Sequence, residues 1–331
     1  MKNKMRIIAL EEHYMTKTVV EDTFNDNKAQ KKEPWLDSVA KPLLDRLCDL
    51  DDLRISEMDA AGIDIQVLSL TAPGVEQMEA NKAVDVARDA NDFLAAAVRR
   101  HPDRFVGLAT LPIMVPDKAA DELERMVCEH GFKGAVINGH TRGRYLDDEF
   151  FWPILERAEK LGVPIYLHPT LPPQSVVETY YKGNFSPEVA TVFSIAGWGW
   201  HIETAIHVLR IILSGAFDRF PELQFIVGHM GEALPFMLQR IDSALPTKLT
   251  KLNKPVSSYL RENIHYTFSS LNYIPPFLNL LLEVGVDRIM FSADHPYCNM
   301  DQAVSFLEQL PVSPADRERI AHANAEDLLK V

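Results

Sequence analysis

The sequence predicts a single (β/α)8 barrel that spans residues 1–331, and three observations support this fold class. Eight short apolar segments rich in β-branched residues recur along the chain. Most of them are apolar at nearly every position, which is typical of strands covered on both faces of a parallel sheet. Amphipathic helical segments stand between them, and eight strand–helix units close into a barrel. An open doubly wound sheet is the structural alternative.

The predicted strands are short runs with Ile, Val, Leu and Phe at most positions. In chain order they are residues 5–10, 63–70, 104–111, 132–138, 163–168, 224–229, 264–269 and 288–294.

The predicted helices have apolar residues at helical spacing and recognisable end signals. The run 50–62 ends in Gly62. The segment 81–104 is predicted to form a long amphipathic helix that stops before Pro102. Several helices close on glycine, as helix C-termini often do. The remaining helical segments are residues 117–131, 147–162, 202–215, 233–245 and 274–285.

Two connections, at about residues 14–45 and 169–202, are too long to be simple turns. Both follow predicted strands, and connections of this length usually form lids or binding loops. We therefore expect lid-like insertions within one domain. The first connection contains Trp35. The second contains aromatic residues that we interpret as lid packing rather than as groups that stack on substrate: Tyr180, Tyr181, Trp198 and Trp200.

Composition and charge narrow the classes of partner. The formal net charge of −13 disfavours nucleic acid, and no Lys/Arg cluster of the kind that binds anionic membranes is present. Small molecules or other proteins are the expected partners.

The three cysteines and the first apolar run of the sequence indicate the cellular compartment of the protein. Cys48, Cys128 and Cys298 form no C-x-x-C pair, which favours a reducing compartment over a disulfide framework. The first apolar run is too short for a signal sequence, and no run reaches the length of a membrane span. We predict a soluble, uncleaved, cytoplasmic protein.

Polar side chains end several of the predicted strands, and the carboxyl ends of barrel strands form the active-site face. These residues are Glu11 and His13 on the first strand, Asn138 on the fourth, His168 on the fifth, His229 on the sixth, and Asp294 with His295 on the eighth.

A metal site explains four of these residues together. Glu11 and His13 stand two apart, so both can face the barrel mouth while Glu12 turns away. With His168 and Asp294 they supply two imidazoles and two carboxylates, a set that suits one Zn²⁺ or Mn²⁺ ion with positions open for substrate.

Each of these four residues also has a structural explanation by itself: a solvated strand end, a core histidine or a helix cap. Their joint placement at strand ends favours the metal. His140, His201, His207 and His265 lack such placement, and we assign them structural roles.

Other polar residues carry the remaining site predictions. Glu232, three residues after His229, is predicted to orient that imidazole for proton transfer, although a first-turn acid is also favourable at a helix N-terminus. Asn138 either orients substrate or simply forms an Asn-Gly turn. Arg240 either binds a carboxylate or forms a helix-surface ion pair.

Several segments resemble the amidohydrolase-related decarboxylases. They are ALEEH, FKGAVINGHTRGRYLDDEFFWPILE, VPIYLHP, the stretch from ETAIHVLRIILSGAFDRFPELQFIVGHMGEALPF to RID, and RIMFSADHPY. The resemblance runs from about Arg6 to the C-terminus. It is strongest to the γ-resorcylate (2,6-dihydroxybenzoate), 2,3-dihydroxybenzoate and 5-carboxyvanillate decarboxylases.

This resemblance implies roles for particular residues. Glu11, His13, His168 and Asp294 match the metal ligands, and His229 with Glu232 matches the acid/base pair. Candidate substrate contacts are Asn138, Phe24 and Arg240. Many hydrolytic relatives carry His-x-His on the first strand and a carboxylated lysine on the fourth. Here Glu11 replaces the first histidine and Asn138 stands near the lysine position, which favours one metal and decarboxylation. The resemblance also suggests homodimers or homotetramers.

The predicted function is metal-dependent, non-oxidative decarboxylation of an ortho-hydroxylated, dihydroxybenzoate-like aromatic acid. Either Asp294 or His229 protonates the ring, and the sequence leaves this choice open. One alternative is a mononuclear metal-dependent hydrolase of an amide or lactone. Another is a catalytically silent barrel used for binding.

Overall fold

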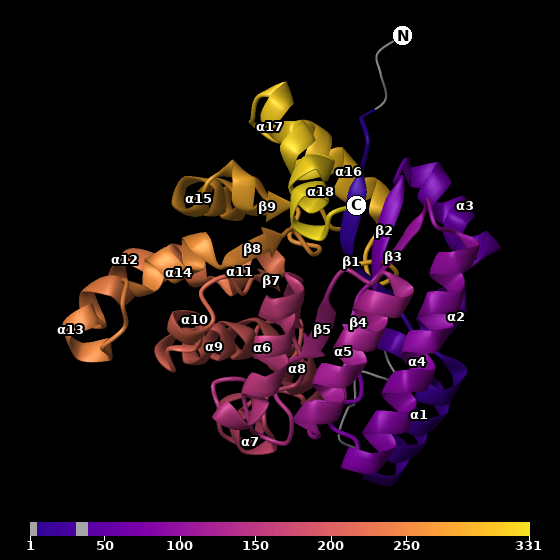
Figure 1. Cartoon of the computed structure of the whole chain (residues 1–331), viewed down its shortest axis with the longest axis horizontal. Coiled ribbons are helices and arrows are strands. Elements are labelled where there is room, and N and C mark those ends of the chain that lie inside the picture. Colours follow the sequence, from indigo (N-terminus) through magenta and orange to yellow (C-terminus); the bar gives the residue numbers. More distant parts are fainter. Residues whose placement is uncertain (1–4, 31–38) are drawn as a thin grey trace.

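Parallel strands alternate with helices along the chain (Figure 1). The structure is a computed structural model that describes residues 5–30 and 39–331, with the backbone alone for residues 24–30. The strands are β1 (Ile8–Tyr14), β2 (Ile65–Leu70), β3 (Phe105–Gly107), β4 (Ala109–Thr110), β5 (Ala135–Asn138), β6 (Ile165–His168), β7 (Phe225–Val227), β8 (Ile264–Thr267) and β9 (Ile289–Met290).

Helices follow most of the strands. The longer ones are α1 (Lys17–Gln30), α3 (Asp52–Ala61), α4 (Ala80–Arg100), α5 (Pro116–His130), α6 (Trp152–Leu161), α9 (Gly199–Leu213), α12 (Leu234–Ala244), α15 (Ile274–Val284) and α16 (Met300–Gln309). Shorter ones are α2 (Leu44–Cys48), α7 (Gln174–Tyr180), α8 (Pro187–Ser194), α10 (Ala216–Arg219), α11 (His229–Glu232), α13 (Thr247–Thr250), α14 (Val256–Glu262), α17 (Pro314–Glu318) and α18 (Asn324–Leu329).

The strands form a closed (β/α)8 barrel. They pair in parallel in the orders β1-β2-β3 and β4 to β9. Leu108 joins β3 to β4: its N–H donates to Leu68 of β2, while the next N–H, of Ala109, donates to Gly134 beside β5. At the other junction, Leu10 pairs with Ser292 as a parallel bridge. The predicted barrel is confirmed, and each predicted strand segment overlaps a strand.

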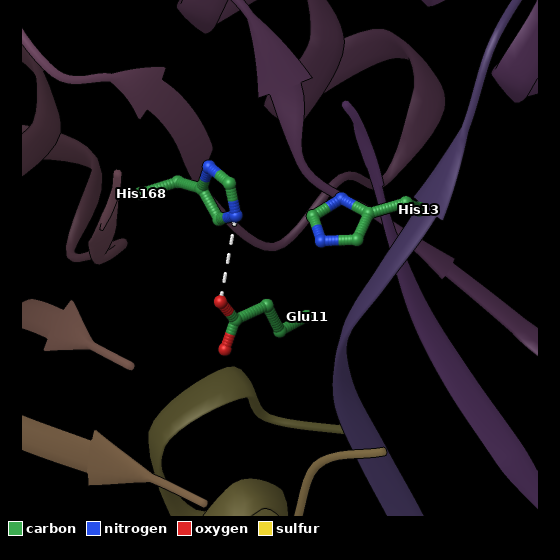
Figure 2. Close-up of side chains that lie close together, drawn as sticks. All are labelled: Glu11, His13 and His168. Carbon is green, nitrogen blue, oxygen red and sulfur yellow. Dashed lines mark ion pairs between the residues drawn. The ribbon is translucent and has the colours of Figure 1, made fainter. Parts of the chain in front are cut away.

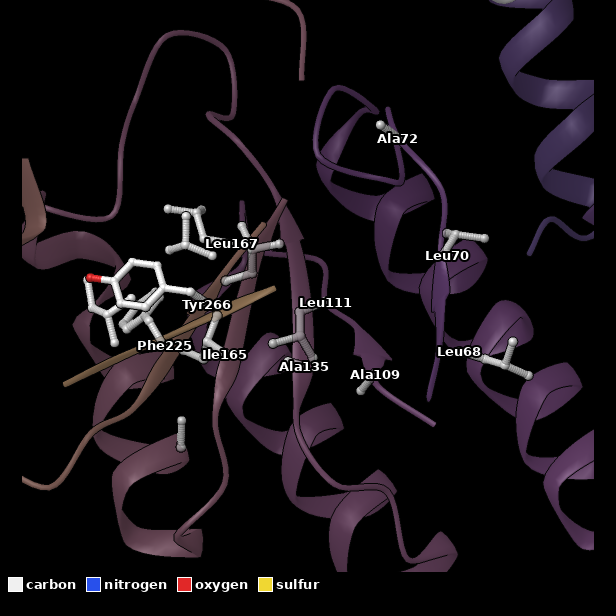
Figure 3. Close-up of a cluster of buried hydrophobic side chains, with 14 of the residues drawn as sticks. Leu68, Leu70, Ala72, Ala109, Leu111, Ala135, Ile165, Leu167, Phe225 and Tyr266 are labelled. Atoms are coloured by element: carbon white, nitrogen blue, oxygen red, sulfur yellow. The ribbon is translucent and has the colours of Figure 1, made fainter. Parts of the chain in front are cut away.

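Two hydrophobic clusters correspond to the two sides of the barrel wall. The inner cluster alternates along the strands and includes Ile8, Leu10, Val67, Tyr166 and Ile226, with α18 residues at its base. The outer cluster takes the intervening strand residues and packs them against the helices (Figure 3). Because nearly all strand residues are buried on both faces, the strand sequences are mainly apolar away from the site residues.

The predicted helices are confirmed, with shifted ends. The run 81–104 forms α4 and ends at Arg100, before Pro102. Gly62 and Gly162 end α3 and α6 in the left-handed conformation, which glycine adopts without steric cost.

The long connections contain helices that the periodicity did not indicate. Residues 169–202 hold α7, α8 and the start of α9, and residues 14–45 hold α1 and the start of α2. In Figure 1, α1 and α7 lie at the end of the molecule toward which β1 runs, away from the N-terminus. Their role as lids stays a prediction, and Trp35 lies outside the described residues. Among the described helices, none is both long and apolar enough to cross a membrane.

Candidate active site

Three of the four predicted ligands converge at the carboxyl end of the barrel. Glu11 and His13 of β1 and His168 of β6 are buried, and each offers a ligand atom within 4.8 Å of those of the others. Figure 2 shows both rings directed at the Glu11 carboxylate, with His168 Nε2 3.5 Å from Glu11 Oε1. The ring centroids of His13 and His168 are 4.9 Å apart.

An irregularity in β1 positions Glu11. The prediction ended the strand at residue 10, whereas β1 continues to Tyr14 with a shift in its pairing to β2 between Ala9 and Glu12. Glu11 there adopts a φ of 61°. The Tyr166 hydroxyl donates to Glu11 Oε2, and the Thr267 hydroxyl lies 3.2 Å from the same oxygen. These contacts orient the carboxylate and leave Oε1 without a hydrogen bond.

Glu12 turns away from this cluster, as predicted. Its carboxylate accepts hydrogen bonds from Gln66 Nε2 at 3.0 Å and from the Ala293 N–H at 2.8 Å. The buried Arg54 donates to the His13 carbonyl at 2.7 Å, so it holds this part of β1 in place. None of the three acidic and imidazole side chains of β1 is a solvated strand end, because all three are buried.

Asp294, the fourth predicted ligand, lies at the edge of the cluster. Its Oδ1 is 3.2 Å from His13 Nε2, and its side chain is 13% exposed. It is not part of the mutually close group formed by Glu11, His13 and His168. Asp294 therefore contacts the ligand cluster but faces its open side.

His229 and Glu232 form the predicted pair. His229 Nδ1 lies 2.8 Å from Glu232 Oε1, and both side chains are buried. The segment is an irregular turn: Met230 and Gly231 have φ of 55° and 82°, and α12 begins only at Leu234. Glu232 is therefore not the ordinary first-turn acid of a regular helix.

His201, to which the sequence analysis gave a structural role, lies beside the predicted pair. Its Nδ1 lies 2.6 Å from Glu232 Oε2, and its ring centroid is 4.7 Å from that of His229. It sits in the first turn of α9, at the end of the 169–202 insertion. No strand end precedes His201, so the rule that identified the other candidates did not apply to it. By contrast, His140 and His207 bond to backbone groups, and His265 contacts Arg288.

The predicted substrate contacts are less well defined by the geometry. Asn138 is the register partner of His168 and is buried. Its N–H donates to Glu76 Oε1 at 2.7 Å, and its Oδ1 makes no hydrogen bond. Arg240 is exposed on α12, and no ion pair joins it to another candidate in the described residues. The side chain of Phe24 lies outside the described residues.

Backbone strain is concentrated among these residues. Glu11, His229, Glu232 and Asp294 all have φ between 49° and 61°, a region that non-glycine residues rarely occupy. Each such residue costs about 1–3 kcal/mol and is retained where the surrounding structure imposes it, often at functional sites. This strain points to function rather than to packing alone.

The electrostatics suit a cation. Burial raises the pKa of Glu11 and lowers that of His168 far below its usual value, so the His168 ring is neutral and can donate a lone pair. Glu11 Oε1 and both ring nitrogens of His13 are buried without hydrogen bonds. Buried polar atoms are rarely left unpaired. The residues present therefore fit a divalent metal ion with mixed nitrogen and oxygen ligands.

The pKa of His229 is shifted in the opposite direction to that of His168. Burial would lower its pKa, but the carboxylates of Glu232 and Glu11 outweigh burial and raise the pKa of His229 to about 10. His229 is therefore protonated at neutral pH in the metal-free protein, and it can act as an acid.

The buried carboxyl of Glu76 gives a test of these electrostatics by pH. Burial raises the pKa of Glu76 to about 7 from 4.5. The folded state thus binds a proton that the unfolded state releases, and this stabilisation is complete below pH 4.5 and is lost as pH rises to about 7. Between pH 5 and about 7.5, we expect the free energy of unfolding of the metal-free wild-type protein to fall by about 1–3 kcal/mol relative to that of Glu76→Gln. Urea unfolding of both proteins at several pH values measures this difference. If the free energy of unfolding depends on pH in the same way in both proteins, the prediction is contradicted.

Comparisons with known proteins agree with this geometry. The family described as amidohydrolase matches residues 29–331. A γ-resorcylate decarboxylase from a Polaromonas species is 38% identical over 340 residues, covering 98% of each chain.

Solved structures are similar over the whole chain. The 5-carboxyvanillate decarboxylase of Novosphingobium aromaticivorans, complexed with manganese and 4-hydroxy-3-methoxy-5-nitrobenzoic acid, has a TM-score of 0.92 and 33% identity, covering 100% of this chain and 97% of that one. A dihydroxybenzoic acid decarboxylase of Polaromonas, with bound manganese and the inhibitor 2-nitroresorcinol, has a TM-score of 0.87 and 38% identity, covering 98% and 97%.

Proposed function

Because this chain belongs to the amidohydrolase family, we propose that it is a metal-dependent, non-oxidative decarboxylase of an aromatic acid with a hydroxyl group ortho to the carboxylate. The observation that carries the proposal is the juxtaposition of two groups. A buried cluster, Glu11, His13 and His168, contains ligand atoms that make no hydrogen bond, and it lies beside a proton-transfer pair, with His229 Nδ1 4.0 Å from Glu11 Oε1.

Glu11, His13 and His168 would hold the metal ion, with Asp294 at its open side. When bound, a divalent cation supplies positive charge and open coordination positions for two substrate oxygens. Manganese is our first choice, because two similar decarboxylases hold it. Zinc remains the second, since the mixed nitrogen and oxygen set also suits that ion.

The residues of this chain would supply the proton. The reaction breaks the bond between the ring carbon and the carboxylate, releases CO₂ and places a proton on the same carbon. Glu232 fixes the Nδ1–H of His229 by its hydrogen bond, which leaves Nε2 to deliver a proton. Asp294, close to His13 and partly exposed, is the second candidate donor. Protonation interrupts the aromatic ring, and loss of CO₂ restores it; solvent then reprotonates the donor.

The polar side chains of the cluster would also suit a metal-dependent hydrolase. One experiment distinguishes decarboxylase from hydrolase activity. We would incubate the purified, Mn²⁺-loaded protein with 2,6-dihydroxybenzoate, 2,3-dihydroxybenzoate and 5-carboxyvanillate, and with aryl amides and lactones. Release of CO₂ and the decarboxylated phenol from at least one acid is expected, and chelation of the metal should stop it. Hydrolysis of an amide or lactone without CO₂ release from any acid would overturn the proposal.

Location and assembly also remain proposals. Cys48, Cys128 and Cys298 are unpaired, which supports a cytoplasmic enzyme. A homodimer or homotetramer is the proposed assembly.

A further inference from the structure

We propose that His201 is a positioning residue of the acid/base pair: it carries a proton on both ring nitrogens and holds the second oxygen of the Glu232 carboxylate, whose first oxygen contacts His229. The catalytic part of this inference rests on the proposed function, whereas the protonation of the ring can be tested by itself.

The two contacts of the ring define its protonation. His201 Nε2 lies 3.1 Å from the Ala196 carbonyl oxygen, which can only accept a hydrogen bond. His201 Nδ1 lies 2.6 Å from Glu232 Oε2, and an ionised carboxylate also only accepts. Both contacts are hydrogen bonds only if both nitrogens carry hydrogen. The ring is then a cation.

The Glu232 carboxylate offers its second oxygen to this donor. Its side chain is fully buried, and an ionised carboxylate in that position is costly unless it is paired and hydrogen bonded. One oxygen accepts from His229 at 2.8 Å, and the other accepts from His201. With both oxygens engaged, Glu232 has one orientation. This orientation keeps the proton of His229 on Nδ1 and directs Nε2 away from Glu232.

His201, His229 and Glu232 also match a metal-binding set by residue type and spacing. Their pairing argues against that use. Both carboxylate oxygens of Glu232 and the two ring nitrogens that face them are already hydrogen bonded to one another. In the first cluster, by contrast, Glu11 Oε1 and both nitrogens of His13 have no hydrogen-bond partner.

The contact also connects the 169–202 insertion to the acid/base pair. Ala196 lies in the turn between α8 and α9, and its carbonyl fixes the His201 ring from that side. The insertion thus supports Glu232 through His201, without contributing a group that must touch the substrate.

Ring protonation is tested on protein loaded with diamagnetic Zn²⁺ and labelled with ¹⁵N-histidine. We expect His201 to show two protonated ring nitrogens at pH 7, assigned by their absence in His201→Ala. A neutral His201 ring would overturn the proposal. This readout does not depend on activity, so it remains decisive even if no acid is decarboxylated and the proposed function fails.

Kinetics test the positioning role. His201→Ala should lower kcat by about 10- to 100-fold, the usual cost of losing a partner that orients a site residue, with KM and bound metal unchanged. His201→Asn should recover part of kcat, because its amide can donate to Glu232 from the position of Nδ1. The control is His322→Ala, which removes another histidine–glutamate contact, to Glu326 at 3.0 Å, outside the site. Unchanged kcat in His201→Ala, or loss of a second metal equivalent, would overturn the proposal.

Discussion

Replacing His168 by alanine is expected to remove both the bound metal ion and turnover. His168 provides one of three ligand atoms that lie within 4.8 Å of one another, and burial keeps its ring neutral and able to coordinate. Changing a residue that merely orients a ligand costs about 10- to 100-fold in metal affinity, so losing the ligand itself should cost more than about 100-fold. Metal analysis after gel filtration and CO₂ release from the most active acid measure the two losses.

The control for His168→Ala is the same substitution at His265. This histidine lies on another barrel strand, β8, and is also buried, but its Nε2 contacts Arg288 at 2.9 Å instead of the metal cluster. We expect His265→Ala to retain its metal and most of its turnover. A His168→Ala protein that is folded by circular dichroism, free of metal and fully active would refute the scheme.

The fold was predictable because its signals are local. Strands buried on both faces are apolar at most positions, and helices such as α4 and α5 show their period within a few turns. The bulge in β1 was not predictable, because it arises from pairing with β2, more than fifty residues away in the chain. The same pairing extends β1 past Glu11 and His13, which the apolar run alone placed at its end.

The site was predictable to the extent that strand ends determine it. Glu11, His13 and His168 follow from the rule that barrel strands direct their carboxyl ends to one face. Tyr166 does not follow from this rule, because a tyrosine inside an apolar strand is expected to pack in the core. Only the structure shows that its hydroxyl donates a hydrogen bond to Glu11. His201 was missed for a related reason: its contact with Glu232 joins residues 31 positions apart across an insertion.

Asp294 distinguishes metal binding from proton transfer. It touches His13 but lies outside the close group of three ligands, and part of it is exposed at the open side. Its φ of 59° is one that asparagine tolerates as well as aspartate, so Asp294→Asn should not strain the backbone. The substitution keeps an oxygen in place and removes the ability to exchange a proton at neutral pH.

Asp294→Asn is therefore expected to bind about one equivalent of metal and to lose about 10²- to 10⁴-fold in kcat, the range for removing a general acid or base. Metal analysis and single-turnover kinetics measure the two effects, with His229→Asn compared in parallel. Each variant is also incubated with the decarboxylated product in deuterated solvent, and exchange of the hydrogen on the ring carbon that carried the carboxylate is followed. The residue whose replacement stops this exchange without preventing ligand binding is the proton donor. Asp242→Asn, which changes a carboxylate bonded to Ser257 on α14, is the control and should remain active. If Asp294→Asn loses its metal as fully as His168→Ala does, Asp294 acts as an essential ligand, because the three close side chains cannot then hold the ion without it.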